Sequence, residues 1–143
     1  ALGGGGRVLS CEVDLAVACV ARSVLDCAGV QAEAVVRVGL ACDWAALGRL
    51  GIVDVLVLDH RGTRYHEDLC LAEPSFAKHG VRVIADNVLC PGAPLFLPYV
   101  CEQGYRTAIH SVPEFLQNWI EDWVVVSVPA RSSGSRQQVP APR

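Results

Sequence analysis

The residues best suited to chemistry are acidic and amide side chains that follow apolar runs. Asp59 ends the run over residues 53–58, and Asp86 and Asn87 follow the run over residues 81–85. If both runs are parallel strands, their carboxyl ends lie at the sheet edge where open α/β folds bind ligands. Two carboxylates and an amide supply the hard oxygen ligands that suit Mg²⁺. Spacing alone leaves two interpretations open: a magnesium site, or ordinary turn-forming and helix-capping residues.

A third acidic residue, Glu12, ends another predicted strand over residues 7–13. Acidic side chains at such a place in nucleotide-binding sheets accept hydrogen bonds from a ribose diol. Asp14 follows at once and is a suitable N-cap for a helix. If this edge binds a ligand, the three strand ends would offer oxygen atoms to a metal ion and to a ribose, and the alternative of ordinary turn-forming and capping residues stays open.

The apolar periodicity predicts the elements that must position these residues. Strands are expected over residues 7–13, 35–38, 53–58, 81–85, 105–110 and 123–128. Helices are expected between Asp14 and Gly29 and over residues 44–50, 66–79, 94–103 and 113–120, and the helix over residues 66–79 is expected to bend or break near Pro74. Residues 53–58 are apolar on both faces, which is typical of a strand buried between helix layers. Strands that alternate with helices predict an α/β fold with a mostly parallel sheet.

The first helix has a clear apolar face. Its apolar residues recur at helical spacing, and the expected core-facing set is Val17, Val20, Ala21, Val24, Leu25 and Ala28. Cys19 and Cys27 fall on the same side, where a free cysteine behaves as a small hydrophobic residue.

Composition excludes several classes of protein. The 143 residues carry a net charge of −3, with 52% hydrophobic and 19% charged residues, so a single folded domain is expected and a mainly disordered chain is excluded. The acidic balance gives no reason to expect nucleic-acid binding. No run approaches the ~18 apolar residues that a membrane-spanning helix needs. Seven cysteines without a Cys-x-x-Cys pair favour a reducing compartment, the cytoplasm or an organelle interior.

Three segments are expected along the chain. Residues 1–6 form a Gly-rich loop, residues 7–128 form the α/β domain, and residues 129–143 form a flexible tail rich in Ser, Gln and Pro.

The sequence motifs that contain the acidic residues resemble those of animal catechol O-methyltransferases. They read Leu58-Asp59-His60, Ala85-Asp86-Asn87-Val88 and Pro91-Gly92-Ala93-Pro94. The resemblance runs from about residue 7 to residue 128. It implies a class I methyltransferase-like, Rossmann-like three-layer sandwich whose mostly parallel sheet has an antiparallel C-terminal strand.

The resemblance also implies cofactors and their binding residues. Mg²⁺ would be held by Asp59, Asp86 and Asn87, and S-adenosylmethionine by Glu12 at its ribose and His60 near its adenine. The implied reaction is methyl transfer to one hydroxyl of a catechol-type small molecule. A deprotonated oxygen attacks the sulfonium methyl in line, and the enzyme mainly supplies proximity and charge stabilisation.

The chain departs from the family at positions that matter for activity. Gly62 stands at the position of the catalytic lysine, and Gln117 stands where the family has an acidic contact to the catechol. The family's first strand and its glycine-rich cofactor loop lie upstream of Ala1, so the first βα unit is expected to be lacking. We therefore expect the polypeptide as given to be inactive. The alternatives are a non-catalytic structural or accessory subunit of a larger assembly, and a binding module without turnover. The sequence leaves open whether either cofactor is bound.

The lacking unit predicts a slot in the sheet between residues 7–13 and residues 53–58. Unpaired backbone groups on strands buried on both faces are costly, so neither edge is expected to be bare. Direct pairing of the two strands, residues upstream of Ala1, or another polypeptide would close the slot.

Overall fold

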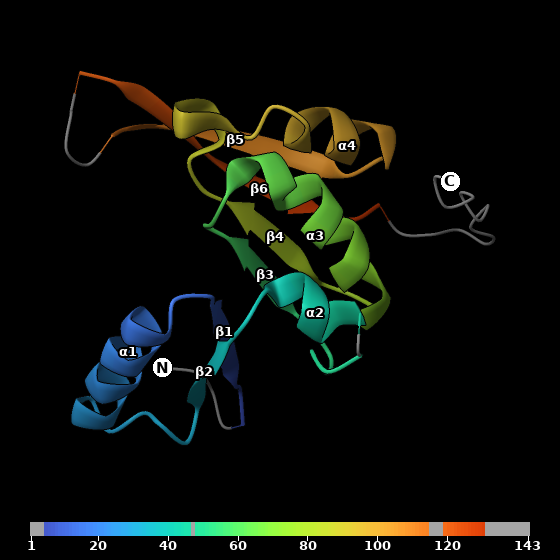
Figure 1. Cartoon of the computed structure of the whole chain (residues 1–143). Helices are drawn as coiled ribbons and strands as arrows, with labels where there is room; N and C mark the ends of the chain where they lie inside the picture. Colours follow the sequence, from blue (N-terminus) through green and yellow to red (C-terminus); the bar gives the residue numbers. More distant parts are fainter. Residues whose placement is uncertain (1–4, 47, 115–118, 131–143) are drawn as a thin grey trace. The chain divides into compact units, whose positions relative to one another are not determined.

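The structure is a computed structural model, and it describes residues 5–46, 48–114 and 119–130. The chain divides into two compact units, residues 1–52 with 67–75 and residues 53–66 with 76–143. Figure 1 shows the helices and strands, coloured along the sequence from blue at the N-terminus to red at the C-terminus. The limits predicted for the Gly-rich loop and the tail fall largely outside the described residues and stay predictions.

The first unit is built on two parallel strands. β1 (Val8–Glu12) pairs with β2 (Ala34–Val38) over five positions, from Val8 opposite Ala34 to Glu12 opposite Val38. Helix α1 (Leu15–Cys27) connects the two strands, and the short helix α2 (Ala41–Ala46) follows β2 (Figure 1). The unit also contains Glu67–Ser75, which includes most of α3 (Tyr65–Ala72).

Helix α1 begins and ends at the residues that the sequence predicted. One carboxylate oxygen of Asp14 accepts hydrogen bonds from the backbone N–H groups of Ala16 and Val17, at 2.7 and 3.2 Å. At the other end Ala28 is the C-cap, and Gly29 follows with φ of +70°. Both caps satisfy backbone groups that the helix itself leaves without partners.

The apolar face predicted for α1 is wrong as a core face among the described residues. Ala18 is the buried residue of the helix, whereas Val17, Val20 and Val24 are 51%, 65% and 61% exposed. The side of α1 nearest β2 carries Arg22 instead, whose guanidinium donates to the carbonyl oxygen of Val36 at 2.8 and 3.1 Å. A two-stranded sheet is narrow, so it covers one stripe of the helix and leaves the valines outside.

The second unit is built on a mixed four-stranded sheet. The spatial order is β3 (Val55–Leu58), β4 (Arg82–Ala85), β6 (Glu121–Val128) and β5 (Arg106–Pro113). The β3–β4 pair is parallel, and β6 runs antiparallel to both of its neighbours. The expected α/β sheet with an antiparallel C-terminal strand is confirmed. Helix α4 (Phe96–Glu102) and a tight turn, η3 (Val88–Gly92), precede β5.

The core of the second unit combines strand residues with two aromatic rings. Tyr65 and Phe96 are at most 1% exposed and meet edge to face, with ring centroids 6.0 Å apart. Such edge-to-face pairs add to the stabilisation that burial of the rings provides. The other buried apolar residues of this unit are Leu58, Val81, Val83, Ala85, Val88, Ala93, Val100 and Val125.

Two predicted helices have different bounds in the structure. The helix expected over residues 44–50 is α2, which begins three residues earlier, so that Asp43 lies in its first turn. The helix expected over residues 66–79 breaks near Pro74 as predicted: α3 ends at Ala72 and a short 3₁₀ turn (Glu73–Ser75) follows, because Pro74 cannot continue the helical hydrogen bonding.

The end of the domain also differs from the prediction. The strand expected over residues 105–110 runs on to Pro113, because its ladder with β6 continues to the pair Pro113–Glu121. For the helix expected over residues 113–120, residues 115–118 lie outside the described residues. The described ends of that segment are joined by a hydrogen bond from the N–H of Glu114 to the carbonyl oxygen of Ile120, at 2.8 Å.

The prediction that residues 53–58 are buried on both faces is wrong for the described chain. Val55 and Val57 are 54% and 60% exposed, whereas Leu58 on the opposite face is buried. The reason is that β3 is an edge strand, and the part of the chain that the structure describes pairs it with β4 alone.

Strand β1 likewise pairs with β2 alone among the described residues, in a separate sheet. Because β1 and β3 belong to different units, closure of the slot by their direct pairing, by upstream residues or by another polypeptide stays a prediction.

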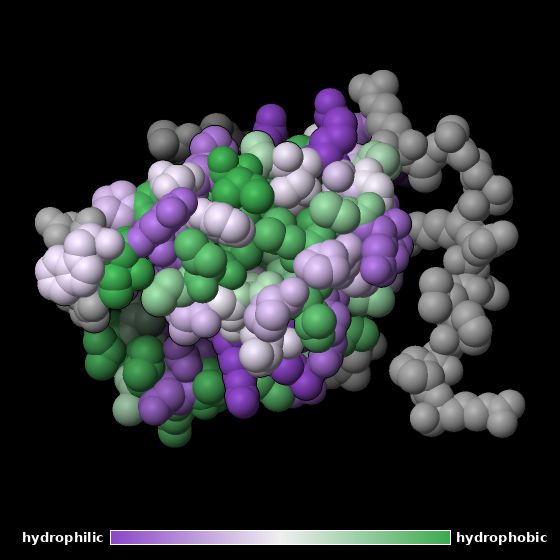
Figure 2. All heavy atoms as spheres, turned by 90° about the horizontal axis from the view of Figure 1, so that it is seen from above, coloured by the Kyte–Doolittle hydropathy of each residue, from purple (hydrophilic) through white to green (hydrophobic). Residues whose placement is uncertain are grey.

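In the ranges that the structure describes, no helix is long and apolar enough to cross a membrane. Hydrophobic side chains nevertheless reach the surface among hydrophilic ones on the face drawn in Figure 2.

Candidate metal and cofactor site

The parallel pairing of β3 and β4 brings two of the predicted metal ligands to the same edge. Leu58 lies opposite Ala85, and the N–H of Asp86 donates to the carbonyl oxygen of Leu58 at 2.9 Å. Asp59 and Asp86 therefore occupy matching positions just beyond adjacent strands, which lie about 4.8 Å apart in sheets. The expectation that Asp59, Asp86 and Asn87 share the carboxyl edge of one sheet is confirmed. Their role as metal ligands stays a prediction.

Asn87 makes the turn that ends this edge. Its φ and ψ are 52° and 37°, in the left-handed region that asparagine adopts more readily than most residues. Its backbone N–H donates to Oδ1 of Asp86 at 2.8 Å. The turn thus fixes one oxygen of Asp86 and directs the chain into Val88–Gly92.

A buried carboxylate that the sequence analysis did not single out, that of Asp122, binds this turn through hydrogen bonds. Asp122, at the start of β6, is 2% exposed. Its Oδ2 accepts a hydrogen bond from Nδ2 of Asn87 at 2.6 Å. Its Oδ1 accepts from the backbone N–H groups of Leu89, Cys90 and Trp123, at 3.2, 3.0 and 2.7 Å. The available signal was an acidic residue directly before an apolar strand.

The hydrogen bonds decide the charge of Asp122. Burial alone raises the pKa of its carboxyl, but the bonds from Cys90, Asn87, Trp123 and Leu89 together outweigh burial and lower that pKa below its ordinary value. Hydrogen bonds to the charged form favour ionisation. Asp122 is therefore a carboxylate, which can only accept hydrogen bonds.

The pKa of the buried Tyr65 hydroxyl reflects the negative charge of the carboxylates at this edge. Its Oη lies 3.1 Å from the carbonyl oxygen of Asp86 and 3.4 Å from that of His60. Burial, followed by the negative charge of Asp59, raises the pKa of Tyr65 to about 12, and Asp86 and Asp122 act in the same direction. Three carboxylates thus act on one phenol, and the same concentration of negative charge favours a cation.

The donor set fits Mg²⁺. In the described part of the chain, the carboxylate of Asp59, the second oxygen of Asp86 and Oδ1 of Asn87 accept no hydrogen bond. The described ranges contain no group of three His, Cys, Asp or Glu side chains that could hold a metal ion. A magnesium site at this edge would therefore use the amide oxygen of Asn87 as its third protein ligand. Mg²⁺ commonly takes few protein oxygens and keeps waters or substrate oxygens for its other positions.

Gly62, which the resemblance puts at the position of the family's catalytic lysine, is closely packed in the structure. A Cβ atom placed on Gly62 would overlap the backbone carbonyl oxygen of Gly92, and it would also crowd Ala93. Any larger side chain there, lysine included, requires the turn Val88–Gly92 to move.

The remaining predicted site residues lie in different parts of the chain. In the first unit Glu12 ends β1, and its Oε1 accepts from the backbone N–H of Asp14 at 2.8 Å. In the second unit His60 is exposed, with its ring centroid 5.0 Å from that of Tyr65. Gln117 lies outside the described residues.

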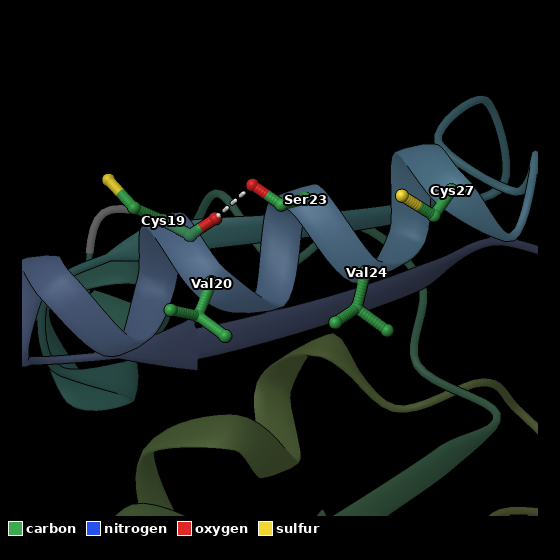
Figure 3. Close-up of a pocket in the computed structure, with 5 residues that line it drawn as sticks. All are labelled: Cys19, Val20, Ser23, Val24 and Cys27. Atoms are coloured by element: carbon green, nitrogen blue, oxygen red, sulfur yellow. Dashed lines mark hydrogen bonds between the residues drawn. The ribbon is translucent and has the colours of Figure 1, made fainter.

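A shallow apolar hollow lies elsewhere, along one face of α1 (Figure 3). Its lining residues are Cys19, Val20, Ser23, Val24 and Cys27. Its one polar interaction is local, from the hydroxyl of Ser23 to the carbonyl oxygen of Cys19 at 3.0 Å. Two of the lining residues are free cysteines, but the described residues bring no third His, Cys, Asp or Glu side chain to them that would complete a metal site.

The chain is similar in sequence to curated O-methyltransferases. It is 37% identical over 124 residues to a transmembrane O-methyltransferase homolog of Mus musculus, an alignment that covers 80% of this chain and 48% of that protein. It is also 37% identical over 118 residues to catechol O-methyltransferase of Sus scrofa, covering 78% of this chain and 63% of that protein. The chain thus spans about half to two thirds of the length of these relatives. No protein-family model matches it.

Solved structures agree on the fold. An O-methyltransferase from Bacillus cereus in complex with SAH superposes with a TM-score of 0.78 at 19% identity, covering 88% of this chain and 64% of that one. The O-methyltransferase TomG from Streptomyces achromogenes in complex with SAM gives a TM-score of 0.75 at 20% identity, covering 88% and 63%. The arrangement of strands and helices is that of class I methyltransferases.

Proposed function

Because this chain belongs to the catechol O-methyltransferase family by sequence and to the class I methyltransferases by fold, we propose that it carries the magnesium site of an S-adenosylmethionine-dependent O-methyltransferase for catechol-type hydroxyls. The observation that supports this most is the register of β3 and β4. It puts Asp59 beside Asp86 and Asn87, three residues that each keep at least one oxygen atom that accepts no hydrogen bond within the described chain.

Each cofactor has proposed binding residues. Asp59, Asp86 and Asn87 would hold Mg²⁺, and Glu12 and His60 would contact the ribose and the adenine of S-adenosylmethionine. Bound Mg²⁺ would make a catechol hydroxyl more acidic and orient both of its oxygens. The carboxylates also supply the negative potential that draws the cation to this edge. Solved structural neighbours in complex with SAH and with SAM support the choice of cofactor.

The protein's own proton-transfer groups at this edge are few. Tyr65 keeps its proton at neutral pH, because its pKa is about 12, and its buried hydroxyl is engaged with backbone carbonyl oxygens. Gly62 offers no amine where the family has its lysine. We therefore propose that this polypeptide as given transfers methyl groups poorly or not at all. Loss of a general base typically costs on the order of 10²–10⁴ in rate.

A non-catalytic structural or accessory subunit is the second candidate. The close packing of Gly62 against Gly92 favours it, because this packing excludes the catalytic side chain itself. The exposed valines of α1 also favour it, since apolar surface of this kind suits contact with another protein.

One experiment tests the metal site and activity separately. Mn²⁺ binding, followed by electron paramagnetic resonance, should be clear for the wild-type chain and at least tenfold weaker for Asp59→Asn and Asp86→Asn. Asp54→Asn is the matched control, because Asp54 is an exposed carboxylate before the opposite end of β3. Absence of Mn²⁺ binding by the wild-type chain would contradict the proposed site.

Activity is measured with catechol, Mg²⁺ and S-adenosylmethionine. We expect no methyl transfer above the uncatalysed rate. Turnover within tenfold of the ~10 s⁻¹ of an ordinary enzyme would show that the chain is an active methyltransferase and that Gly62 is no obstacle.

A further inference from the structure

We infer that Asp122 is a positioning residue that fixes the orientation of the Asn87 side-chain amide, so that Oδ1 of Asn87 is the atom offered to a divalent cation. The inference rests on the proposed magnesium site, and it assigns a function to a buried residue of β6 that is not itself one of the ligands.

The two oxygens of Asp122 have separate tasks. Oδ1 accepts three backbone N–H groups and so holds the start of the turn Val88–Gly92 against β6. Oδ2 accepts the amide N–H of Asn87 at 2.6 Å. Oδ1 thus stabilises the backbone conformation of the turn, whereas Oδ2 fixes the torsion angle of the Asn87 side-chain amide.

An asparagine amide has nearly the same shape in its two flipped orientations, so packing alone selects poorly between them. One end carries two donors and the other an acceptor. Both oxygens of Asp122 act as acceptors, Oδ1 toward three backbone N–H groups and Oδ2 toward Nδ2 of Asn87, so the end of Asn87 that meets Asp122 is the NH₂ group. The amide oxygen is then left on the other side. A flipped amide would offer N–H groups to a cation and would repel it.

Burial makes this selection strong. Asp122 is 2% exposed, so water has little access to replace the bond from Asn87. Hydrogen bonds to a charged acceptor are also stronger than neutral ones, particularly away from water. The left-handed backbone of Asn87 fixes where the side chain starts, and Asp122 fixes how the amide is turned.

Asp122→Asn separates the two tasks. The new amide can keep its oxygen toward the three backbone N–H groups, and its NH₂ group then replaces Oδ2. Asn87 must turn its own oxygen toward this new donor and present its NH₂ group to the cation. Mn²⁺ affinity should fall by about 10–100-fold, as is typical when a residue that orients a metal ligand is changed. Glu121→Gln is the matched control, because it removes an equal charge from the adjacent exposed position of β6.

The double variant Asp122→Asn with Asn87→Asp restores the lost oxygen. A carboxylate at position 87 can accept the new amide N–H with one oxygen and offer the other to the cation. Mn²⁺ affinity should therefore return to the wild-type value or exceed it. A merely structural function of Asp122 predicts no rescue beyond the gain that Asn87→Asp alone gives the wild-type chain, since the second substitution repairs none of the backbone contacts of Asp122.

A measurement on the wild-type chain covers the case in which Asp122→Asn does not fold. The side-chain amide of Asn87 should show one strongly downfield proton in a ¹H–¹⁵N spectrum, and this proton should persist when Mg²⁺ is added. The signals of this amide should shift as Mg²⁺ binds.

The outcomes distinguish the inference from the site on which it rests. If the wild-type chain binds no Mn²⁺, the magnesium site and the inference fail together. If it binds Mn²⁺ and a folded Asp122→Asn variant binds equally well, the inference alone fails. A folded double variant whose Mn²⁺ affinity stays as low as that of Asp122→Asn also overturns the inference. Signals of the Asn87 side-chain amide that do not shift when Mg²⁺ binds overturn it as well.

Discussion

The two units differ in how much apolar surface their sheets can cover. The second unit has four paired strands, and Leu58, Val83, Phe96 and Val125 are at most 2% exposed. In the first unit the two strands and α1 bury only Ala18 and Val36, and the outer valines of α1 are exposed. An amphipathic pattern therefore predicts which helix face can be buried. Whether it is buried depends on the width of the sheet beside it, and two strands alone give only marginal stability.

The largest expected effect comes from the aromatic core of the second unit. Phe96→Ala should lower the free energy of unfolding by about 3–5 kcal/mol, because it leaves a cavity beside Tyr65. Val20→Ala, on the exposed face of α1, should change it by no more than about 0.5 kcal/mol. Urea denaturation of both variants measures the difference. If Val20→Ala lowers the free energy of unfolding as much as Phe96→Ala does, the face of α1 that carries Val20 is covered in solution.

The next effect tests the close packing of the turn that carries the candidate site. Gly62→Ala should cost about 1–3 kcal/mol, because its methyl group must push the Gly92 carbonyl aside. Thr63→Ala, at the exposed neighbouring position, is the control and should be close to neutral. Thermal unfolding compares the two variants. A neutral Gly62→Ala would mean that the turn yields easily, and a lysine at position 62 could then be accommodated.

A smaller effect is expected at the start of α1. Asp14→Ala removes the acceptor for the N–H groups of Ala16 and Val17 and should cost about 1 kcal/mol. Hydrogen exchange should quicken along α1 and stay unchanged in β4 and β6 of the second unit. Asp26→Ala, near the other end of the helix, is the control and should not destabilise, because an acidic residue is unfavourable there. Equal quickening in both units would show that they unfold together.

The smallest expected effect is chemical and concerns the cysteines of the first unit. Burial, followed by the neighbouring Cys42, raises the pKa of the Cys11 thiol. Because the thiolate is the reactive form, Cys11 should be alkylated more slowly than the exposed Cys19 at about pH 8. The difference should narrow as the pH rises through the raised pKa of Cys11. Peptide mass spectrometry after timed alkylation measures both rates, and faster labelling of Cys11 at the lower pH would contradict the assigned burial.

Local patterns allowed much of this protein to be predicted. Asp14 and Gly29 marked the ends of α1, because caps act on backbone groups within a few residues. The apolar runs located β3 and β4, and the polar residues after them fell at the same sheet edge, because parallel strands end together. The predicted end of a strand was wrong where pairing with a distant strand continued it, as in β5, whose hydrogen-bonded ladder with β6 extends to Pro113.

Residue type and short-range spacing in the amino-acid sequence by itself predicted the α/β fold and the strand-end positions of the candidate ligands Asp59, Asp86 and Asn87, and the motifs around these residues carried the resemblance to catechol O-methyltransferases. Only the tertiary structure decided how those ligands are held. Asp122 bonds to Asn87 across 35 positions of sequence, and Gly62 packs against a turn that no local pattern places beside it. It also decided that Val20, Val55 and Val57 are exposed, because burial depends on which strands and helices lie alongside.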